Sequence, residues 1–138
     1  MEQSVVATRK RRGGCDIGRK GFQDLIVWQR AKDLAVKIYK LSENGVLSHD
    51  FGLRDQIRRS AISIASNLAE GDERGTDKES IRFFHIAKGS LAELKTQVQI
   101  AYEIGYLKRE FYESLENECN ELGKMIGRLI QVRKGSLS

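Results

Sequence analysis

The chain has 138 residues, of which 40% are hydrophobic and 31% are charged, which is the composition of one ordinary globular domain. It contains no apolar run long enough to span a bilayer, and its N-terminus lacks the continuous apolar segment of a secretory signal. We therefore expect a cytoplasmic protein without membrane contact. Cys15 and Cys119 are far apart, and Cys119 falls on an apolar stripe, which favours a buried, reduced thiol.

The net charge of +5 is concentrated near the N-terminus. Residues 1–20 carry 6 basic and 2 acidic side chains, or +4, whereas residues 21–138 carry 18 basic and 17 acidic side chains, or +1. A basic extension suits nucleic-acid phosphates. The alternative is a disordered segment that only aids solubility, or an over-long start of the reading frame. We divide the chain into a basic extension over 1–20, a folded domain over 21–134 and a flexible tail over 135–138.

The first predicted helix covers residues 22–43, with Asp24 as its N-cap and with Asn44 and Gly45 at its end. Its apolar residues recur at steps of three and four, which places them on one face of a helix. This inner stripe consists of Val27, Ala31, Leu34, Ile38 and Leu41.

The second predicted helix begins at Phe51 and ends at Glu70, and Gly71 is expected to take the left-handed conformation just past that end. Its inner stripe consists of Leu53, Ile57, Ala61, Ile64 and Leu68. A second stripe of Ile62, Ala65 and Ala69 lies beside the first, with small side chains between the two. This wide apolar arc indicates a helix that is packed on more than one side.

Polar residues at the end of this helix form a predicted structural network of Asn67, Glu70, Gly71 and Arg74. Glu70 lies where the helix dipole is negative, so a nearby cation should offset its charge. Arg74 and Arg82 are the candidates for that cation. The alternative is that this group contacts a ligand or a partner.

Thr76 and Glu79 have the spacing of a capping box, which predicts the start of a third helix. That helix should be the longest, at about 30 residues or ~45 Å, and Gly105 should end it. Its inner row consists of Phe84, Ala87, Leu91, Leu94, Val98 and Ala101. A parallel row of Phe83, Ile86, Ser90, Gln97, Ile100 and Ile104 widens the apolar arc.

The fourth predicted helix follows a tight connection over 106–108 and has Phe111, Leu115, Cys119, Leu122, Ile126 and Leu129 as its stripe. Acidic residues fill its first half, and the basic residues Lys124, Arg128, Arg133 and Lys134 fill its second half, an order that suits the helix dipole.

No segment shows a sustained alternation of apolar and polar residues with period two, so we expect no strand. The sequence therefore predicts an all-α, antiparallel up-down-up-down four-helix bundle. The wide apolar arcs further predict that the bundle assembles as a homo-oligomer.

Three blocks of sequence resemble a known family. They are F-x-D-L-x-V-W-Q-x-A at Phe22–Ala31, S-I-x-S-N-L-A-E-G at Ser63–Gly71 followed by Arg74, and I-A-K-G-S-L-A-E-L at Ile86–Leu94. In this order they resemble the 23S rRNA intervening-sequence proteins. The resemblance covers about Gly21 to Val132, and implies a left-handed bundle that forms a homopentamer in the bacterial cytoplasm.

The same fold is similar to the accessory protein of diversity-generating retroelements, a basic pentamer that engages nucleic acid and a reverse transcriptase. The biochemical role of the intervening-sequence family itself is not established. This chain departs from the family in having Ala65 where proline is usual, so its second helix should be straighter.

We expect no catalytic, cofactor or metal site. His49 and His85 lack the Glu-x-x-His spacing of a di-iron bundle, and His85 is expected on the wet face of its helix. The chain also lacks a C-x-x-C motif, a phosphate-binding glycine loop and a nucleophile elbow.

Three functional hypotheses remain. The first is a non-enzymatic oligomer that binds nucleic acid, with structured RNA favoured over DNA, through basic side chains repeated around a ring. The candidates are Arg54, Arg58 and Arg59, helped by Arg30, Arg74, Arg82, Lys88 and the extension. The second is a scaffold for a protein partner such as a polymerase or nuclease, and the third, an enzyme, is remote. The competing explanation for the arginines is surface salt bridging, because Arg59 follows Asp55 by four residues.

Overall fold

The computed structural model describes residues 21–135, apart from the side chains of residues 23 and 24. Its helices are η1 (Gly21–Asp24), α1 (Ile26–Leu41), η2 (Val46–His49), α2 (Phe51–Asp72), α3 (Asp77–Glu103) and α4 (Arg109–Gly135). No strand occurs over residues 21–135, so the all-α, four-helix prediction is confirmed. The predicted extension over 1–20 and residues 136–138 of the predicted tail lie outside the described residues.

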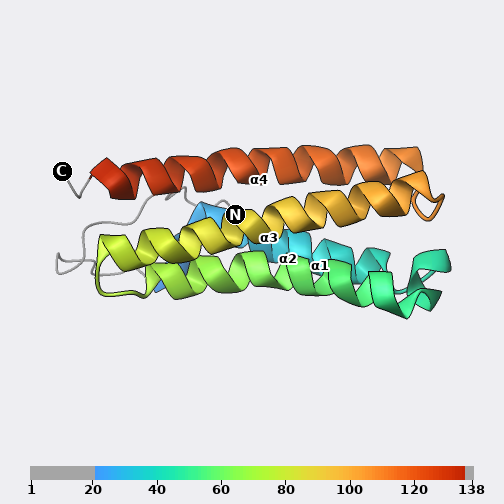
Figure 1. Cartoon of the computed structure of the whole chain (residues 1–138), viewed down its shortest axis with the longest axis horizontal. Helices are drawn as coiled ribbons and strands as arrows, with labels where there is room; N and C mark the ends of the chain where they lie inside the picture. Colours follow the sequence, from blue (N-terminus) through green and yellow to red (C-terminus); the bar gives the residue numbers. More distant parts are fainter. Residues whose placement is uncertain (1–20, 136–138) are drawn as a thin grey trace.

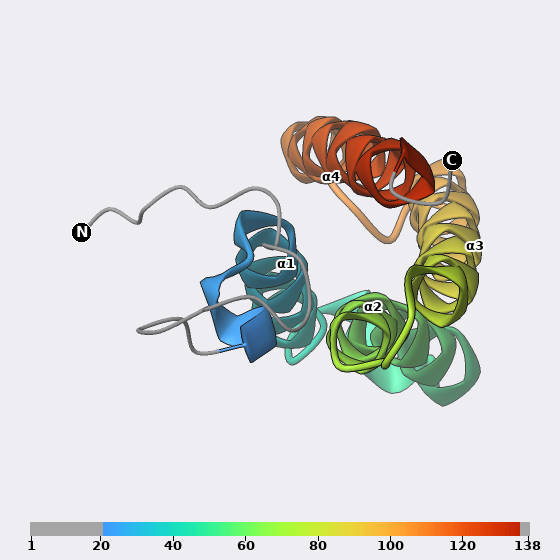
Figure 2. The same cartoon turned by 90° about the vertical axis from the view of Figure 1, so that its left-hand side faces the viewer.

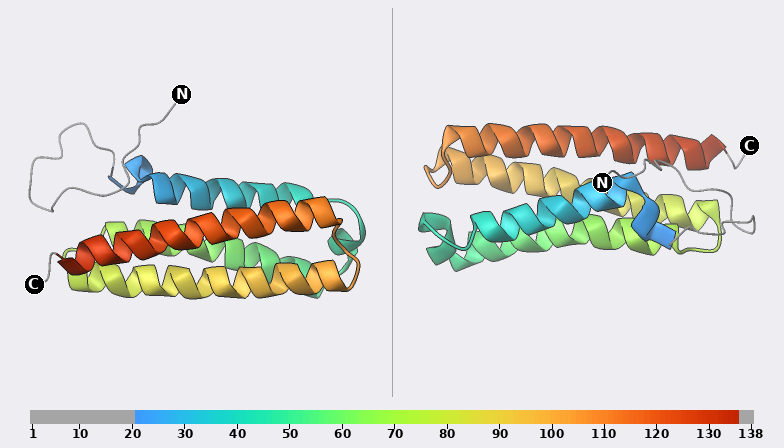
Figure 3. Two further views of the ribbon diagram at one scale, coloured as in Figure 1. Left: turned by 90° about the horizontal axis from the view of Figure 1, so that it is seen from above. Right: turned by 180° about the vertical axis from the view of Figure 1, so that it is seen from behind.

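The four long helices lie side by side along one axis (Figure 1) and follow one another in chain order when viewed from the end (Figure 2). One end of the bundle holds η2 and the α3–α4 link, and the other holds the α2–α3 link and the end of α4 (Figure 3). Cross-helix hydrogen bonds set the register of α2 on α3, joining Ser63 to Ser90 at 2.8 Å and Gln56 to Gln97 at 3.3 Å. Residue numbers therefore rise along α2 as they fall along the facing part of α3.

Most of the core comes from the predicted inner stripes, and Leu25, Leu47, Leu107 and Ile130 complete it. The six residues of the inner row of α3 are all buried, and so are the stripes of α1 and α2 except for the half-buried Leu41 and Leu53. Phe111 was predicted to join the stripe of α4, but its side chain is 47% exposed. It lies in the first turn of α4, where Leu107 from the preceding link is buried instead.

The predicted helix boundaries hold best where a side chain caps the helix. The Thr76 hydroxyl accepts a hydrogen bond from the Glu79 backbone N–H at 3.2 Å, which confirms the predicted start of α3. Gly105 follows Ile104, the C-cap of α3, and its φ of 89° confirms it as a helix-ending glycine. The predicted end of the first helix at Asn44 and Gly45 is wrong, because α1 ends at Leu41 and Gly45, with a φ of 78°, is the N-cap of η2. The N-cap prediction for α1 is wrong, because a 3₁₀ turn precedes Leu25, which occupies the N-cap position without a side-chain cap.

Gly71 is not the residue past the end of α2. It lies inside the helix, is buried, and is absent from the residues with positive φ in the described chain. A Cβ atom at Gly71 would lie 2.7 Å from Cε1 of Phe84. The reason for glycine here is thus the close approach of a buried aromatic ring, and the helix continues to Asp72.

A buried ion pair next to Gly71 was not predicted from the sequence. Arg133 was assigned to the solvated basic end of α4, but it is only 4% exposed, and its Nη2 donates to Oδ1 of Asp72 at 3.0 Å. Asp72 is fully buried, and the Arg133 guanidinium lies 5.2 Å from the centroid of the Phe84 ring. Arg133 follows Leu129 by four residues, so its place on the apolar stripe was the available signal.

We predict that Gly71→Ala destabilises the fold by about 1–3 kcal/mol, because the added methyl group overpacks the contact with Phe84. Gly89→Ala is the matched control, since no atom lies within 4 Å of its Cβ position. The control should be neutral or stabilising by up to about 1 kcal/mol, the helix-propensity gain of alanine over glycine. Urea unfolding of both variants measures the difference, and equal effects would contradict the packing role of Gly71.

We also predict that Arg133→Met destabilises the protein by about 3–5 kcal/mol, because it removes the guanidinium that pairs with the buried Asp72 carboxylate. The control Arg109→Met removes a pair with Glu113 whose side chains are 75% and 59% exposed, so its cost should be below about 1 kcal/mol. The double variant Asp72→Leu/Arg133→Met should recover most of the loss in thermal unfolding. A double variant as unstable as Arg133→Met would refute this explanation.

Candidate nucleic-acid interface

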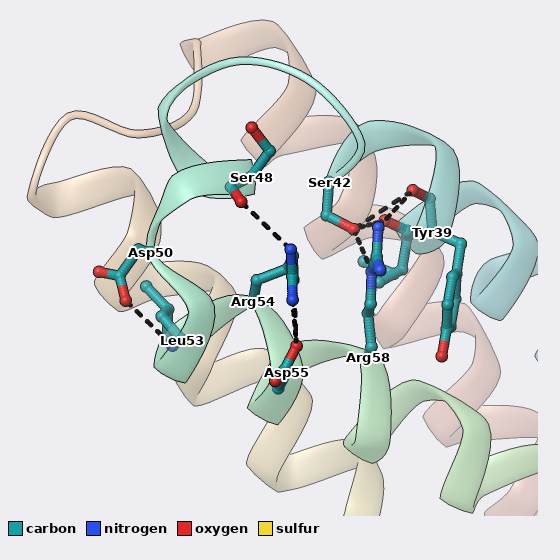
Figure 4. A network of polar contacts seen from close by, with 9 residues as sticks. Tyr39, Ser42, Ser48, Asp50, Leu53, Arg54, Asp55 and Arg58 are labelled. Carbon is teal, nitrogen blue, oxygen red and sulfur yellow. Dashed lines mark hydrogen bonds and ion pairs between the residues drawn. The ribbon is translucent and has the colours of Figure 1, made fainter.

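Arg54 and Arg58 lie in the first turns of α2, whose N-cap is Asp50 (Figure 4). The Asp50 carboxylate caps α2 by accepting a hydrogen bond from the Leu53 N–H at 3.2 Å, and it also accepts one from the Tyr106 hydroxyl at 3.0 Å. The hydrogen bond to Asp50, with burial and the carboxylate charge, raises the pKa of Tyr106. The start of α2 is thereby fastened to the α3–α4 link.

The Arg54 guanidinium forms two hydrogen bonds within the chain. Its Nε donates to Asp55 Oδ1 at 3.0 Å, and its Nη1 donates to the Ser48 carbonyl at 3.2 Å (Figure 4). Its guanidinium carbon also lies 4.8 Å from the centroid of the Phe51 ring. These contacts connect η2 to the first turn of α2.

Arg58 caps the C-terminus of α1. Its Nε donates to the Ser42 hydroxyl at 2.7 Å and its Nη2 to the Tyr39 carbonyl at 3.3 Å (Figure 4). The guanidinium lies over the Tyr39 ring at 4.4 Å, and the Ser42 hydroxyl in turn donates to the Ile38 carbonyl at 2.7 Å. A cation at this place also complements the negative end of the helix dipole.

Arg59 differs from its two neighbours, because it is exposed and makes no hydrogen bond or ion pair with any residue of the described chain. The predicted helix-spaced pair with Asp55 is not formed, since Asp55 pairs with Arg54. Arg59 borders an open hollow of about 450 Å³ between α1 and α2, next to Tyr39 and Arg58.

Arg74, in the α2–α3 link, and Arg82, near the start of α3, both lie against the Phe83 ring. Their guanidinium carbons are 4.6 and 4.7 Å from the centroid of the Phe83 ring. Arg74 forms an ion pair with Glu70, as predicted. Arg82 instead pairs with Glu79 at 3.5 Å, so Arg74 is the cation that offsets the charge of Glu70.

Asn67 belongs to a different polar contact. Its side-chain amide donates to the Ser63 carbonyl at 2.8 Å and to the Ser63 hydroxyl at 3.1 Å. The same Ser63 hydroxyl forms a hydrogen bond with the Ser90 hydroxyl of α3. Asn67 therefore supports the seam between α2 and α3, while the ion pair of Glu70 and Arg74 lies on the exposed side of the helix end.

The last two candidates, Arg30 and Lys88, lie on two different seams of α4. Arg30 forms an ion pair with Glu121 across the α1–α4 seam, where Lys37 also pairs with Glu118 at 2.8 Å. Lys88 is exposed, has no hydrogen bond or ion pair over residues 21–135, and borders the α3–α4 seam. The seven basic candidates thus do not form one patch, and five of them are held by contacts within the chain.

No group of three His, Cys, Asp or Glu side chains within residues 21–135 is placed to hold a metal ion. Both histidines are exposed. Cys119 is a free, buried cysteine, as predicted, and burial raises the pKa of its thiol to about 11. None of the described helices is long and apolar enough to cross a membrane.

We predict that Arg58→Met lowers the free energy of unfolding by about 1.5–3 kcal/mol, because charge-assisted hydrogen bonds to the end of α1 are lost. Arg59→Met is the matched control, with the same change of charge on the next residue, and its effect should stay within about 0.5 kcal/mol. Urea denaturation followed by circular dichroism compares the two. Indistinguishable midpoints would show that the cap contributes nothing to stability.

Comparison with known proteins agrees with this architecture. A solved protein of unknown function, from the S23 ribosomal protein family of Bacteroides thetaiotaomicron, is similar with a TM-score of 0.70 and 28% identity, over 76% of this chain and 98% of that chain. No functionally curated protein matches the chain. The model of the family described as "23S rRNA-intervening sequence protein" matches residues 23–128. The chain therefore belongs to the 23S rRNA-intervening sequence protein family.

Proposed function

We propose that this protein is a non-enzymatic oligomer that binds nucleic acid, with RNA favoured, in the bacterial cytoplasm. Its unit is the antiparallel up-down-up-down bundle, repeated in a homo-oligomer. The observation that carries the proposal is the surface position of cations without an intramolecular partner in the described chain, Arg59 and Lys88 among them, in a family whose description refers to 23S rRNA. Neither the family description nor that of the solved relative names an enzyme.

Exposed apolar side chains support the oligomer. A groove of about 640 Å³ between α1 and α2 is bordered by Trp28, Val36 and Ile62, and the last two are 45% and 43% exposed. On α3, Ile100 and Ile104 are 47% and 53% exposed. Because the core of the bundle is complete without these residues, another copy of the chain is a natural cover for them. Five copies is the number favoured by the resemblance to the family.

Assembly would also explain how a nearly neutral domain binds a polyanion. Residues 21–138 carry a net charge of only +1, so one copy offers little general attraction for phosphates. Repeating the same cations around a ring makes each further contact intramolecular and raises the effective affinity without any new type of contact. Binding of this kind is tolerant of nucleic-acid sequence and steeply dependent on salt.

A second function, a scaffold for a protein partner such as a polymerase or nuclease, is favoured by the same apolar groove between α1 and α2. The two functions differ in their response to salt. Phosphate contacts weaken steeply as salt rises, whereas a packed apolar interface is far less sensitive.

We predict salt-dependent RNA binding by an assembled protein. Light scattering should give an oligomer at micromolar concentration, and RNA affinity should be measured over a salt series for the full chain, for a variant lacking residues 1–20, and for Arg54→Ser/Arg58→Ser/Arg59→Ser. Loss only in the truncation assigns binding to the extension, and loss only in the triple variant assigns it to α2. Circular dichroism must show that the triple variant is folded, since Arg58 caps α1.

A monodisperse monomer would overturn the oligomer. Unchanged affinity and salt slope in both variants would remove the extension and these arginines from the interface. If the full chain binds no RNA at low salt, the scaffold function takes precedence.

A further inference from the structure

The outer seam between α3 and α4 contains a groove of about 340 Å³ that no sequence motif indicated. Lys88 and Lys95 border it from α3, and Lys124 borders it from α4. Lys88 and Lys95 are seven residues apart, which is two helical turns or about 10.5 Å along the axis. Lysine side chains from both helices therefore border this one groove along the bundle.

These lysines have no counter-charge within the described chain. Over residues 21–135, none of the three forms a hydrogen bond or an ion pair, and no carboxylate lines the groove. Two nearby acidic residues of α4 form ion pairs with α1 instead. Glu118 pairs with Lys37, and Glu121 pairs with Arg30. Three like charges on one channel repel one another in the free protein, and an anion in the groove would relieve that repulsion.

A carboxylate lies beyond one end of the groove. Beyond Lys95 lies a much smaller hollow that Glu116 borders, and the Glu116 carboxylate accepts a hydrogen bond from the Tyr112 hydroxyl at 3.3 Å. The basic stretch therefore extends from Lys95 toward Lys88 and away from Glu116, a direction that also leads toward the exposed His85.

Apart from Asn120 and the three lysines, the residues that line the groove are apolar or small. They include Ala92 and Gly123 beside the buried Leu91 and Cys119. Cys119 adds no negative charge at neutral pH, because its pKa of about 11 keeps the thiol protonated. Low-dielectric walls beside charged side chains focus the electric field of the lysines on an anion in the groove.

We infer that the α3–α4 groove binds the phosphate backbone of a single-stranded nucleic acid through Lys88, Lys95 and Lys124. This inference rests on the proposed function and places its contact on a different face from the arginines of α2. Lysine ammonium groups are point charges that bind phosphate oxygens, and lysines are the cations that line this groove. No aromatic side chain lines the groove to stack on a base, so the contacts are with phosphates and carry no sequence information.

The test compares two full-length triple variants with the same change of charge. The groove variant is Lys88→Gln/Lys95→Gln/Lys124→Gln, and the control is Lys40→Gln/Lys78→Gln/Lys108→Gln, which removes three exposed lysines from other parts of the bundle. Fluorescence anisotropy of a labelled oligouridylate over a salt series gives the affinity and the log–log slope. The extension is present in both variants, so its contribution is common to them.

The groove variant should reduce the magnitude of the slope by about 2, because each phosphate contact with a single strand contributes about 0.7. The same relation gives an affinity loss of about 100-fold at ~0.1 M salt. The control should keep the parent slope. Cross-linking of a 4-thiouridine oligonucleotide to the parent, followed by mass spectrometry, should label residues of the 88–95 and 119–124 segments.

Other results overturn the inference in distinguishable ways. Equal losses of RNA affinity in both variants would mean that binding follows net charge alone. If the parent binds RNA and the groove variant binds it equally well, the proposed function stands but the groove is not the site. Equal, lysine-dependent affinity for duplex RNA would remove the single-strand assignment. Lysine-dependent binding of poly-glutamate without lysine-dependent binding of RNA would assign the groove to an acidic protein. A parent that binds no RNA at any salt concentration would refute both this inference and the proposed function.

Discussion

The contact of Gly71 with Phe84 is the constraint on which the α2–α3 end of the bundle depends. The missing side chain lets the ring of α3 lie against the backbone of α2, and the ring then forms one wall of the site where Arg133 meets Asp72. Three helices are joined there around one aromatic side chain. A buried ion pair adds little net stability over an apolar pair, but it admits few alternative registers, because a slipped helix would leave a charge buried alone.

The opposite end is fixed by exposed or half-buried polar groups. Asp50 caps α2 and receives the Tyr106 hydroxyl, while Arg58 crosses to the end of α1. These contacts explain why arginines that look like a phosphate-binding cluster in the sequence serve as connections between helices. Their planar, multidentate guanidinium groups suit carbonyl, hydroxyl and carboxylate partners together. The lysines of the α3–α4 seam have no such partners in the described chain, and they remain available for an external anion.

Helix number, helix type and the inner stripes were predictable because they are local properties of the chain. The period of apolar residues from Phe84 to Ala101 matches the buried row of α3, and the capping box at Thr76 places its first turn. Gly71 and Arg133 were predicted wrongly for a common reason. A glycine near a helix end and a basic residue in a last turn fit general rules of helix termination. In this chain, however, both residues pack against Phe84, which is distant from them in sequence.

The sequence by itself determined the four amphipathic helices, the concentration of charge in residues 1–20 and, through three blocks of residues, the family to which the chain belongs. The tertiary structure decided which cations are engaged. Arg58 and Arg59 are adjacent in the chain and identical in chemistry, yet only Arg58 points to the end of α1 and finds a partner there within the described chain. Whether a charge is paired depends on what the neighbouring helix presents at that point, and this is set by the register of packed helices rather than by any local pattern of residues.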